Sequence, residues 1–245
     1  YVNFNFVSAH QRATRTLLDE ISTGHLPPGE KLNEVELASR LEISRNTLRE
    51  AFIALEDYGV IVRQPHRGVH VTLPDEDLVD EIFRVRSLLE PAVLRWSRGL
   101  NIDALHECVQ DGQLAREAQD HDGAGDANQR FHATIIEGAG SSFADDMMTR
   151  VLAIMRLVFI QVSAKHDGFH YPYVELNDEI AQLVDSGQRE QAAERMRSYL
   201  ERSRDELREL LNSPAPTEVA DAQGSSEVAA EATSEGTEKV KPASD

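Results

Sequence analysis

Two arginines and two small hydrogen-bonding residues lie close together in the run SRNTLREA, residues 44–51. Leu48, Phe52 and Leu55 recur at intervals of four and three residues, which predicts a helix with one buried stripe. The first turns of its opposite face then expose Arg45, Asn46, Thr47 and Arg49. Long cations bind phosphates, and amide and hydroxyl groups bond base edges, so this helix is suited to enter a DNA major groove.

The elements around this run predict a helix-turn-helix. A first helix is expected over residues 36–41, Glu42-Ile43 breaks it, and Ser44 suits the N-cap of the second helix. An earlier helix is expected over residues 10–23, ended by Gly24. Because helix-turn-helix patterns are degenerate, an ordinary surface helix capped by serine is the alternative explanation.

The segment that follows favours the DNA-binding interpretation. After Gly59 the apolar period changes to two, and residues 60–63 and 69–72 form two short β-rich runs around a Pro/Gly turn. A hairpin placed directly after a helix-turn-helix is a wing. Its tip would carry His66, Arg67 and Gly68, and glycine there lets the backbone approach a phosphate closely.

The rest of the chain is predicted to be helical up to residue 211. Helices are expected from residue 78, where Leu78, Ile82, Val85, Leu89 and Val93 form one stripe with a kink at Pro91, and over residues 103–119, 125–137, 142–164, 173–186 and 188–211. Short connections indicate an antiparallel bundle. The fold is therefore expected to be mainly α. It would comprise a winged helix-turn-helix domain (1–73), a linker (74–77), an all-helical ligand-sensing and dimerisation domain (78–211) and a disordered acidic tail (212–245).

The net charge of −18 over 245 residues is distributed unevenly. Residues 1–73 hold 8 Lys and Arg against 9 Asp and Glu, while residues 74–211 hold 15 against 27. A nearly neutral first domain can still bind phosphates, and the acidic remainder suppresses non-specific binding. No apolar run reaches membrane-spanning length, and the single cysteine, Cys108, fits a core position in a reducing compartment, so a cytoplasmic protein is expected.

The stretch GEKLNEVELASRLEISRNTLREAFIALEDYGVIVRQPHRGVHV closely resembles the winged-helix domain of GntR-family bacterial transcription regulators. The resemblance implies that operator contacts come from Ser44, Arg45, Asn46, Thr47, Arg49, His66, Arg67 and Gly68. Val35 departs from the pattern, because the fatty-acid-responsive members carry a DNA-reading arginine there. That contact is expected to be absent.

A looser resemblance, to the FCD-type all-helical effector domain of the FadR subfamily, falls on FRVRSLLEP, NQRFHATIIEGAG and NDEIAQLVDSGQREQAAERMRSYL. Many members bind a divalent metal there through one aspartate and three histidines. The corresponding residues are Asn128, His132, Asn177 and Tyr199, of which only His132 is a good ligand. With no carboxylate among them, we expect no tight metal and no cofactor, although Asp126 or His170 could supply a ligand from a shifted register.

The same four residues would offer donors and acceptors to an organic ligand. The resemblance places Arg86 beside them, where a guanidinium can bind a carboxylate through two hydrogen bonds. We therefore expect a small organic acid or similar metabolite as the effector. The simpler explanations are a satisfied core histidine at position 132 and an i,i+4 pair between Arg86 and Glu90.

Together these features predict a ligand-responsive repressor that binds double-stranded operator DNA as a homodimer, since one recognition helix reads only a half-site. One alternative is a metal-binding or enzymatic helical domain with accessory DNA binding. Against an enzyme, His132 and Tyr199 have no predicted orienting carboxylate. The other alternative is a regulator whose effector site has decayed.

Overall fold

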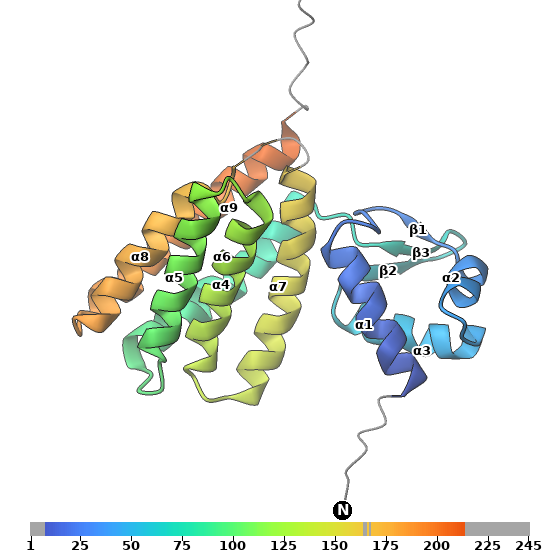
Figure 1. The fold of residues 1–245 in the computed structure, drawn as a ribbon, viewed down its shortest axis with the longest axis horizontal. Coiled ribbons are helices and arrows are strands. Elements are labelled where there is room, and N and C mark those ends of the chain that lie inside the picture. Colours follow the sequence, from blue (N-terminus) through green and yellow to red (C-terminus); the bar gives the residue numbers. More distant parts are fainter. Residues whose placement is uncertain (1–7, 164–165, 167, 214–245) are drawn as a thin grey trace, which may run out of the picture. The chain divides into compact units, whose positions relative to one another are not determined.

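The computed structural model describes residues 8–163, 166 and 168–213, which form nine α-helices and one three-stranded antiparallel sheet (Figure 1). The mainly helical fold class is thereby confirmed. In chain order the elements are α1 (Ala9–Ser22), β1 (Lys31–Leu32), α2 (Glu34–Arg40), α3 (Arg45–Asp57), β2 (Ile61–Gln64), β3 (Gly68–Val71), α4 (Glu76–Trp96), α5 (Ile102–Glu117), α6 (His121–Glu137), α7 (Ser142–Ser163), α8 (Tyr171–Asp185) and α9 (Arg189–Asn212).

The helix-turn-helix consists of α2 and α3. The Asn33 side chain caps α2 by accepting from the backbone N–H of Val35 at 3.0 Å. The break between the helices contains Glu42, whose φ of 54° is left-handed and cannot continue a helix. The predicted stripe of α3 lies in a core shared by α1, α2 and the sheet, and its members are Leu48, Phe52 and Leu55.

The wing is a sheet with strand order β1-β3-β2. Residues 61–64 and 68–71 pair antiparallel as predicted, with Gln64 opposite Gly68. The two-residue strand β1 adds Lys31 opposite His70, and it was not predicted because so short a run has no readable period. Lys31 therefore lies on the wing, 35 positions before its tip in sequence but beside it in the sheet.

Helices α4 to α9 form the bundle, and α5, α6 and α7 run side by side in it (Figure 1). The helix α4 also packs along α9. Its buried stripe differs from the predicted one, because Leu78, Val85 and Leu89 are only partly buried. The buried side chains of α4 are instead Val79, Ile82, Phe83, Arg86, Glu90, Pro91, Val93 and Leu94. An apolar pattern does not reveal this face, because two of its buried members, Arg86 and Glu90, are charged.

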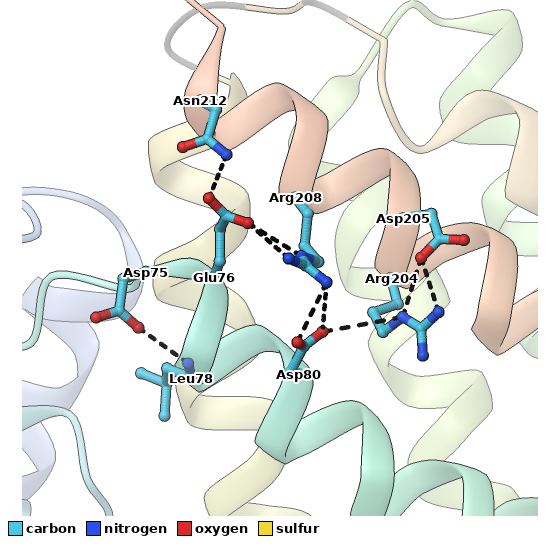
Figure 2. A network of polar contacts seen from close by, with 8 residues as sticks. All are labelled: Asp75, Glu76, Leu78, Asp80, Arg204, Asp205, Arg208 and Asn212. Carbon is cyan, nitrogen blue, oxygen red and sulfur yellow. Dashed lines mark hydrogen bonds and ion pairs between the residues drawn. The ribbon is translucent and has the colours of Figure 1, made fainter.

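Polar contacts fasten the first turn of α4 to the end of α9 (Figure 2). Arg208 donates to Glu76 at 2.8 Å and also contacts Asp80 at 3.2 Å, while Asn212 donates to Glu76. These hydrogen bonds, first from Asn212 and then from Arg208, lower the pKa of Glu76. The helix α4 thus begins at Glu76, inside the stretch 74–77 predicted as a linker. Asn212 is the last residue of α9 rather than part of a tail; residues 214–245 lie outside the described residues.

One bundle helix also contributes to the core of the winged region. Leu157 of α7 is fully buried in the cluster that contains Leu17 and Phe52, and Ala153 packs against that cluster. Arg156, the residue before Leu157, donates from Nε to the backbone carbonyl of Ser22 at the end of α1, at 2.7 Å. The helix α7 therefore contacts both the bundle interior and the winged region.

Candidate DNA interface and buried polar site

The predicted DNA-binding residues of α3 lie together at its exposed start. Ser44 is the N-cap, and its hydroxyl accepts from the Thr47 backbone N–H at 3.1 Å. Arg45, Asn46 and Arg49 are exposed, while Thr47 is half-buried and its hydroxyl lies 2.8 Å from that of Ser44. The helix N-terminus adds positive partial charge to that of the two arginines. This surface is suited to phosphates and base edges.

Arg49 has a partner that the sequence did not indicate. Its Nε donates to Glu34, in the first turn of α2, at 3.0 Å. The Arg49 side chain remains 53% exposed, and an exposed ion pair contributes little to stability. Arg49 can therefore exchange Glu34 for a phosphate at small cost.

The predicted wing-tip residues occupy the turn between β2 and β3. His66, Arg67 and Gly68 are all exposed, and His66 and Gly68 have left-handed φ values of 62° and 95°. A hollow of about 730 Å³ lies between the wing and the start of α4, where Asp75 and Leu78 also line it. It is lined by Lys31 and His70 as well as by His66 and Arg67. Lys31 and His70 extend the basic surface of the wing and were missed because β1 was not predicted.

The five predicted effector residues are joined through a sixth, Glu90, in the interior of the bundle. Arg86 donates from Nε to Glu90 Oε1 at 2.7 Å, and these side chains are 3% and 0% exposed. The other carboxylate oxygen, Oε2, lies 2.6 Å from Nδ1 of His132. One buried carboxylate therefore binds a guanidinium and an imidazole.

The polar chain continues from His132 to the last two helices. Nε2 of His132 lies 2.9 Å from the Tyr199 hydroxyl, which also contacts Oδ1 of Asn128 at 3.0 Å. Asn177 donates from Nδ2 to the same Asn128 oxygen at 2.8 Å. Residues from α4, α6, α8 and α9 thus meet in one network, as their positions in the resemblance implied.

Glu90 corrects the predicted composition of this site. The sequence predicted no carboxylate at the site and none to orient His132, and Glu90 shows that both predictions are wrong. The i,i+4 pair with Arg86 was weighed as a simple explanation, and that contact exists. The contact with His132, 42 positions away, depends on how α4 packs against α6, which no local pattern reveals.

Two atoms of the network have no hydrogen-bond partner among the described residues. They are Nη2 of Arg86 and Oδ1 of Asn177, and both are buried. Burying a charged donor without a partner is costly. The network therefore offers one unfilled donor and one unfilled acceptor to a small polar ligand.

Burial and charge set the protonation of the network. For Glu90, burial acts to raise the pKa, but the charge of Arg86 and then that of His132 outweigh it, so the pKa is lowered. For His132, burial lowers the pKa more than the Glu90 carboxylate raises it. Burial raises the pKa of Tyr199 far above its usual value. Tyr199 is therefore a neutral phenol at physiological pH.

These donors do not fit the divalent metal that many subfamily members hold. Both ring nitrogens of His132 already have partners, and Tyr199 offers a neutral hydroxyl. Asp126 instead binds Arg156 at 2.8 Å, and the His170 ring packs edge-on against Phe159. Over residues 8–163, 166 and 168–213, no group of three His, Cys, Asp or Glu is arranged to bind a metal ion.

The exposed basic start of α3 and the hairpin that follows it, on a chain that continues into a helical bundle, define a winged helix-turn-helix fold joined to an all-helical domain. Two family descriptions match this chain: "Bacterial regulatory proteins, gntR family" over residues 9–71, and "FCD domain" over residues 81–202. The chain belongs to the GntR family. Within the described residues, no helix is both long and apolar enough to cross a membrane.

Similar proteins are regulators as well. The chain is 31% identical over 139 residues to an uncharacterized HTH-type transcriptional regulator of the TAR-I ttuE-ttuC' intergenic region of Agrobacterium vitis, covering 53% of this chain and 78% of that protein. It is 27% identical over 148 residues to the HTH-type transcriptional repressor RspR of Escherichia coli K12, covering 59% and 65%. A GntR transcriptional regulator from Rhodococcus sp. RHA1 has a similar structure, with a TM-score of 0.75, 28% identity and coverage of 81% and 96%. The chain spans 62% and 61% of the length of two further curated relatives.

Removing the charge of Glu90 should destabilise the fold through Arg86. We expect Glu90→Gln to lower the free energy of unfolding by about 3–5 kcal/mol, because a buried guanidinium loses its counterion. Adding Arg86→Met should recover part of the loss, since a neutral pair leaves no unpaired charge. Urea denaturation measures both, with Glu194→Gln as the control because its pair with Arg197 is exposed. Additive losses from Arg86→Met and Glu90→Gln would contradict the coupling.

Acid should weaken the fold in two stages. Burial lowers the pKa of His132 in the folded protein. Its contribution to the free energy of unfolding is therefore complete above the ordinary histidine pKa of about 6.5 and is lost as pH falls below that value. Burial also lowers the pKa of His170, to about 4, which adds to the same decline. Glu90 adds a second loss below the ordinary glutamate value of about 4.3. Thermal melts from pH 8 down to about pH 3 measure both stages, and His132→Gln should reduce the first stage. Equal stability at pH 7 and pH 5 would contradict it.

Proposed function

We propose that this protein is a transcriptional repressor that binds operator DNA as a homodimer in the cytoplasm and responds to a small organic acid. The observation that carries the DNA-binding part is the exposed start of α3, with Arg45, Asn46 and Arg49, together with the exposed Arg67 at the wing tip. Side chains at the start of such a helix reach base edges in the major groove, and the wing contacts the neighbouring backbone. Two-fold operators need two copies of this surface.

The effector proposal rests on the buried network. An anionic ligand would compete with Glu90 for Arg86 and His132, and its remaining polar groups would meet Asn128, Asn177 and Tyr199. Unpartnered Nη2 of Arg86 and Oδ1 of Asn177 support this, because a carboxylate accepts from the first and a hydroxyl donates to the second. We propose no resident metal, since the donor set does not suit one.

Coupling between effector and DNA would pass through α6 and α7. The helix α6 carries Asn128 and His132 on its buried face, and its Asp126 binds Arg156 of α7. Arg156 in turn holds the Ser22 carbonyl at the end of α1. A ligand that moves α6 would therefore change how α1 and the recognition helix are held.

An enzymatic function is the alternative, and Glu90 supplies an orienting carboxylate for His132 that was not predicted from the sequence. Tyr199, however, is only 2% exposed, and burial raises the pKa of its hydroxyl instead of activating it. Two hollows, on the wing and between α5 and α6, are not lined by residues of the network. We therefore propose a sensor site without turnover.

Loss of the recognition-helix cations should weaken operator binding. We expect Arg45→Ala and Arg49→Ala each to reduce affinity about 10- to 100-fold in a fluorescence anisotropy titration, and to reduce its salt dependence where a phosphate contact is lost. Arg150→Ala, an exposed arginine of α7, is the control and should bind as the unmodified protein does. Unchanged affinity in both variants would refute the assignment of α3.

Arg156 should be needed for the response but not for ligand binding. In a thermal-shift screen of small organic acids and divalent metals, an acid should raise the melting temperature and change operator affinity, and DNA should change acid affinity by the same factor. Arg156→Gln should keep the thermal shift and lose most of the effect on DNA, whereas Arg150→Gln should keep both.

Three other outcomes of this screen would each refute part of the proposal. Stabilisation by a metal alone would refute the organic-acid site. No stabilisation by any ligand would favour a decayed effector site. An unchanged response in Arg156→Gln would refute the route through α7.

A further inference from the structure

The outer face of the wing sheet forms the floor of the hollow of about 730 Å³. Lys31 of β1, His70 of β3 and Val62 of β2 lie opposite one another in the antiparallel register, so their side chains emerge on the same face. All three line the hollow. Ile61 and Val69 point the other way, into the core of the winged region. The hollow therefore lies on the side of the sheet that this core does not use.

Two cations line the hollow. Within the described part of the chain, neither Lys31 nor Arg67 forms an ion pair. The stem of Lys31 passes Gly68, where an added Cβ would lie 3.5 Å from its Cε atom, so the lysine extends toward the wing tip that carries Arg67. The neighbouring Arg63 instead binds Glu56 of α3, at 3.4 Å. Positive charge is thus concentrated at the tip end of the hollow.

An unfilled polar atom lies in the same hollow. Nδ1 of His70 is buried and has no hydrogen-bond partner among the described residues. Asp75 is the acidic member of the lining, and its Oδ1 accepts from the Leu78 backbone N–H at 2.9 Å, which caps α4 (Figure 2). An imidazole nitrogen without a partner, together with two cations, suits an anion that accepts several hydrogen bonds.

Apolar side chains line the part of the hollow away from the wing tip. Leu73 follows β3 and is 59% exposed, and Val62 is 41% exposed. Leu78 of α4 is also part of the lining. The volume falls within the range of roughly 300–1,000 Å³ that is typical of small-molecule sites. A single phosphate of a DNA backbone would leave these apolar side chains uncovered.

We propose that this hollow binds a small organic phosphate with an apolar body, and that this ligand competes directly with operator DNA. The phosphate would accept from Lys31, Arg67 and His70, because its oxygens can match several donors at once. The apolar body would cover Leu73. His66 and Arg67 belong both to the hollow and to the predicted operator contacts, so ligand and DNA cannot use the wing tip together.

This site goes beyond the proposed function. It is separate from the buried polar network of the bundle, and binding of the phosphate requires neither DNA nor the bundle effector.

Calorimetric titration of the full chain with phenyl phosphate tests the site, and inorganic phosphate and phenol serve as partial probes. Phenyl phosphate should bind at least about 10-fold more tightly than either, because each lacks one half of the ligand. Lys31→Gln should weaken phenyl phosphate binding about 10-fold or more. Arg63→Gln, which changes an exposed arginine of the same sheet that pairs with Glu56, should leave it unchanged. Leu73→Ser should reduce the affinity to that of inorganic phosphate.

Fluorescence anisotropy with labelled operator tests the competition. At ten times its dissociation constant, phenyl phosphate should lower the apparent operator affinity of the unmodified chain about 10-fold. In Lys31→Gln the same concentration should lower it only about two-fold, because the ligand binds more weakly. Asn177→Ala, which changes the bundle network, should respond as the unmodified chain does.

Four results would count against this site. Binding that persists in Lys31→Gln and Leu73→Ser would place phenyl phosphate outside the hollow and overturn the proposal. Absence of binding would overturn it too, and a smaller salt dependence of operator binding in Lys31→Gln would then assign the hollow to a DNA phosphate. Binding without competition would refute the shared use of the wing tip, and a lost response in Asn177→Ala would move the site to the bundle. Operator binding without phenyl phosphate tests the proposed function separately, so either can fail while the other stands.

Discussion

The buried carboxylate of Glu90 is the constraint on which the bundle interior depends. It neutralises Arg86 and fixes the ring of His132, and that histidine connects α4 to Tyr199 of α9. Each of these groups would be costly in an apolar core without the others. The core around them, with Phe83, Phe131 and Tyr173, is apolar and fully buried. Such a network holds four helices in one arrangement. Any ligand that enters must replace hydrogen bonds that already exist within it.

The network also differs from the metal-ligand set that the family resemblance implies, of which only His132 is present. Where an aspartate and histidines would surround a cation, asparagine and tyrosine meet one histidine, and the positive charge comes from Arg86. The interior thus combines the permanent cation of Arg86 with the buried carboxylate of Glu90. A site with that charge arrangement is better suited to an acid than to a metal ion.

The winged region combines exposed charged residues with a compact apolar core. Its arginines are exposed and only loosely held, as in the pair of Arg49 with Glu34, while a compact core fixes the helix that carries them. Leu157 and Arg156 of α7 join this region to the bundle, so a helix that packs against α6 of the buried polar network also contacts the end of α1. A rigid helix that carries mobile arginine side chains suits DNA recognition, in which phosphate contacts position the protein and base contacts give specificity.

The amino-acid sequence by itself determined the helix-turn-helix, the hairpin and the helical bundle, because helical and strand periods, caps and turns are local properties. The five residues predicted to bind the effector followed from the family resemblance and from no local pattern. The sequence did not reveal the strand β1, the buried stripe of α4 or the role of Glu90. A two-residue strand exists only through its partner, and charged residues do not read as core until their partners are known. Only the tertiary structure, by packing α4 against α6 and α9, decided that Glu90 lies between Arg86 and His132 instead of in water.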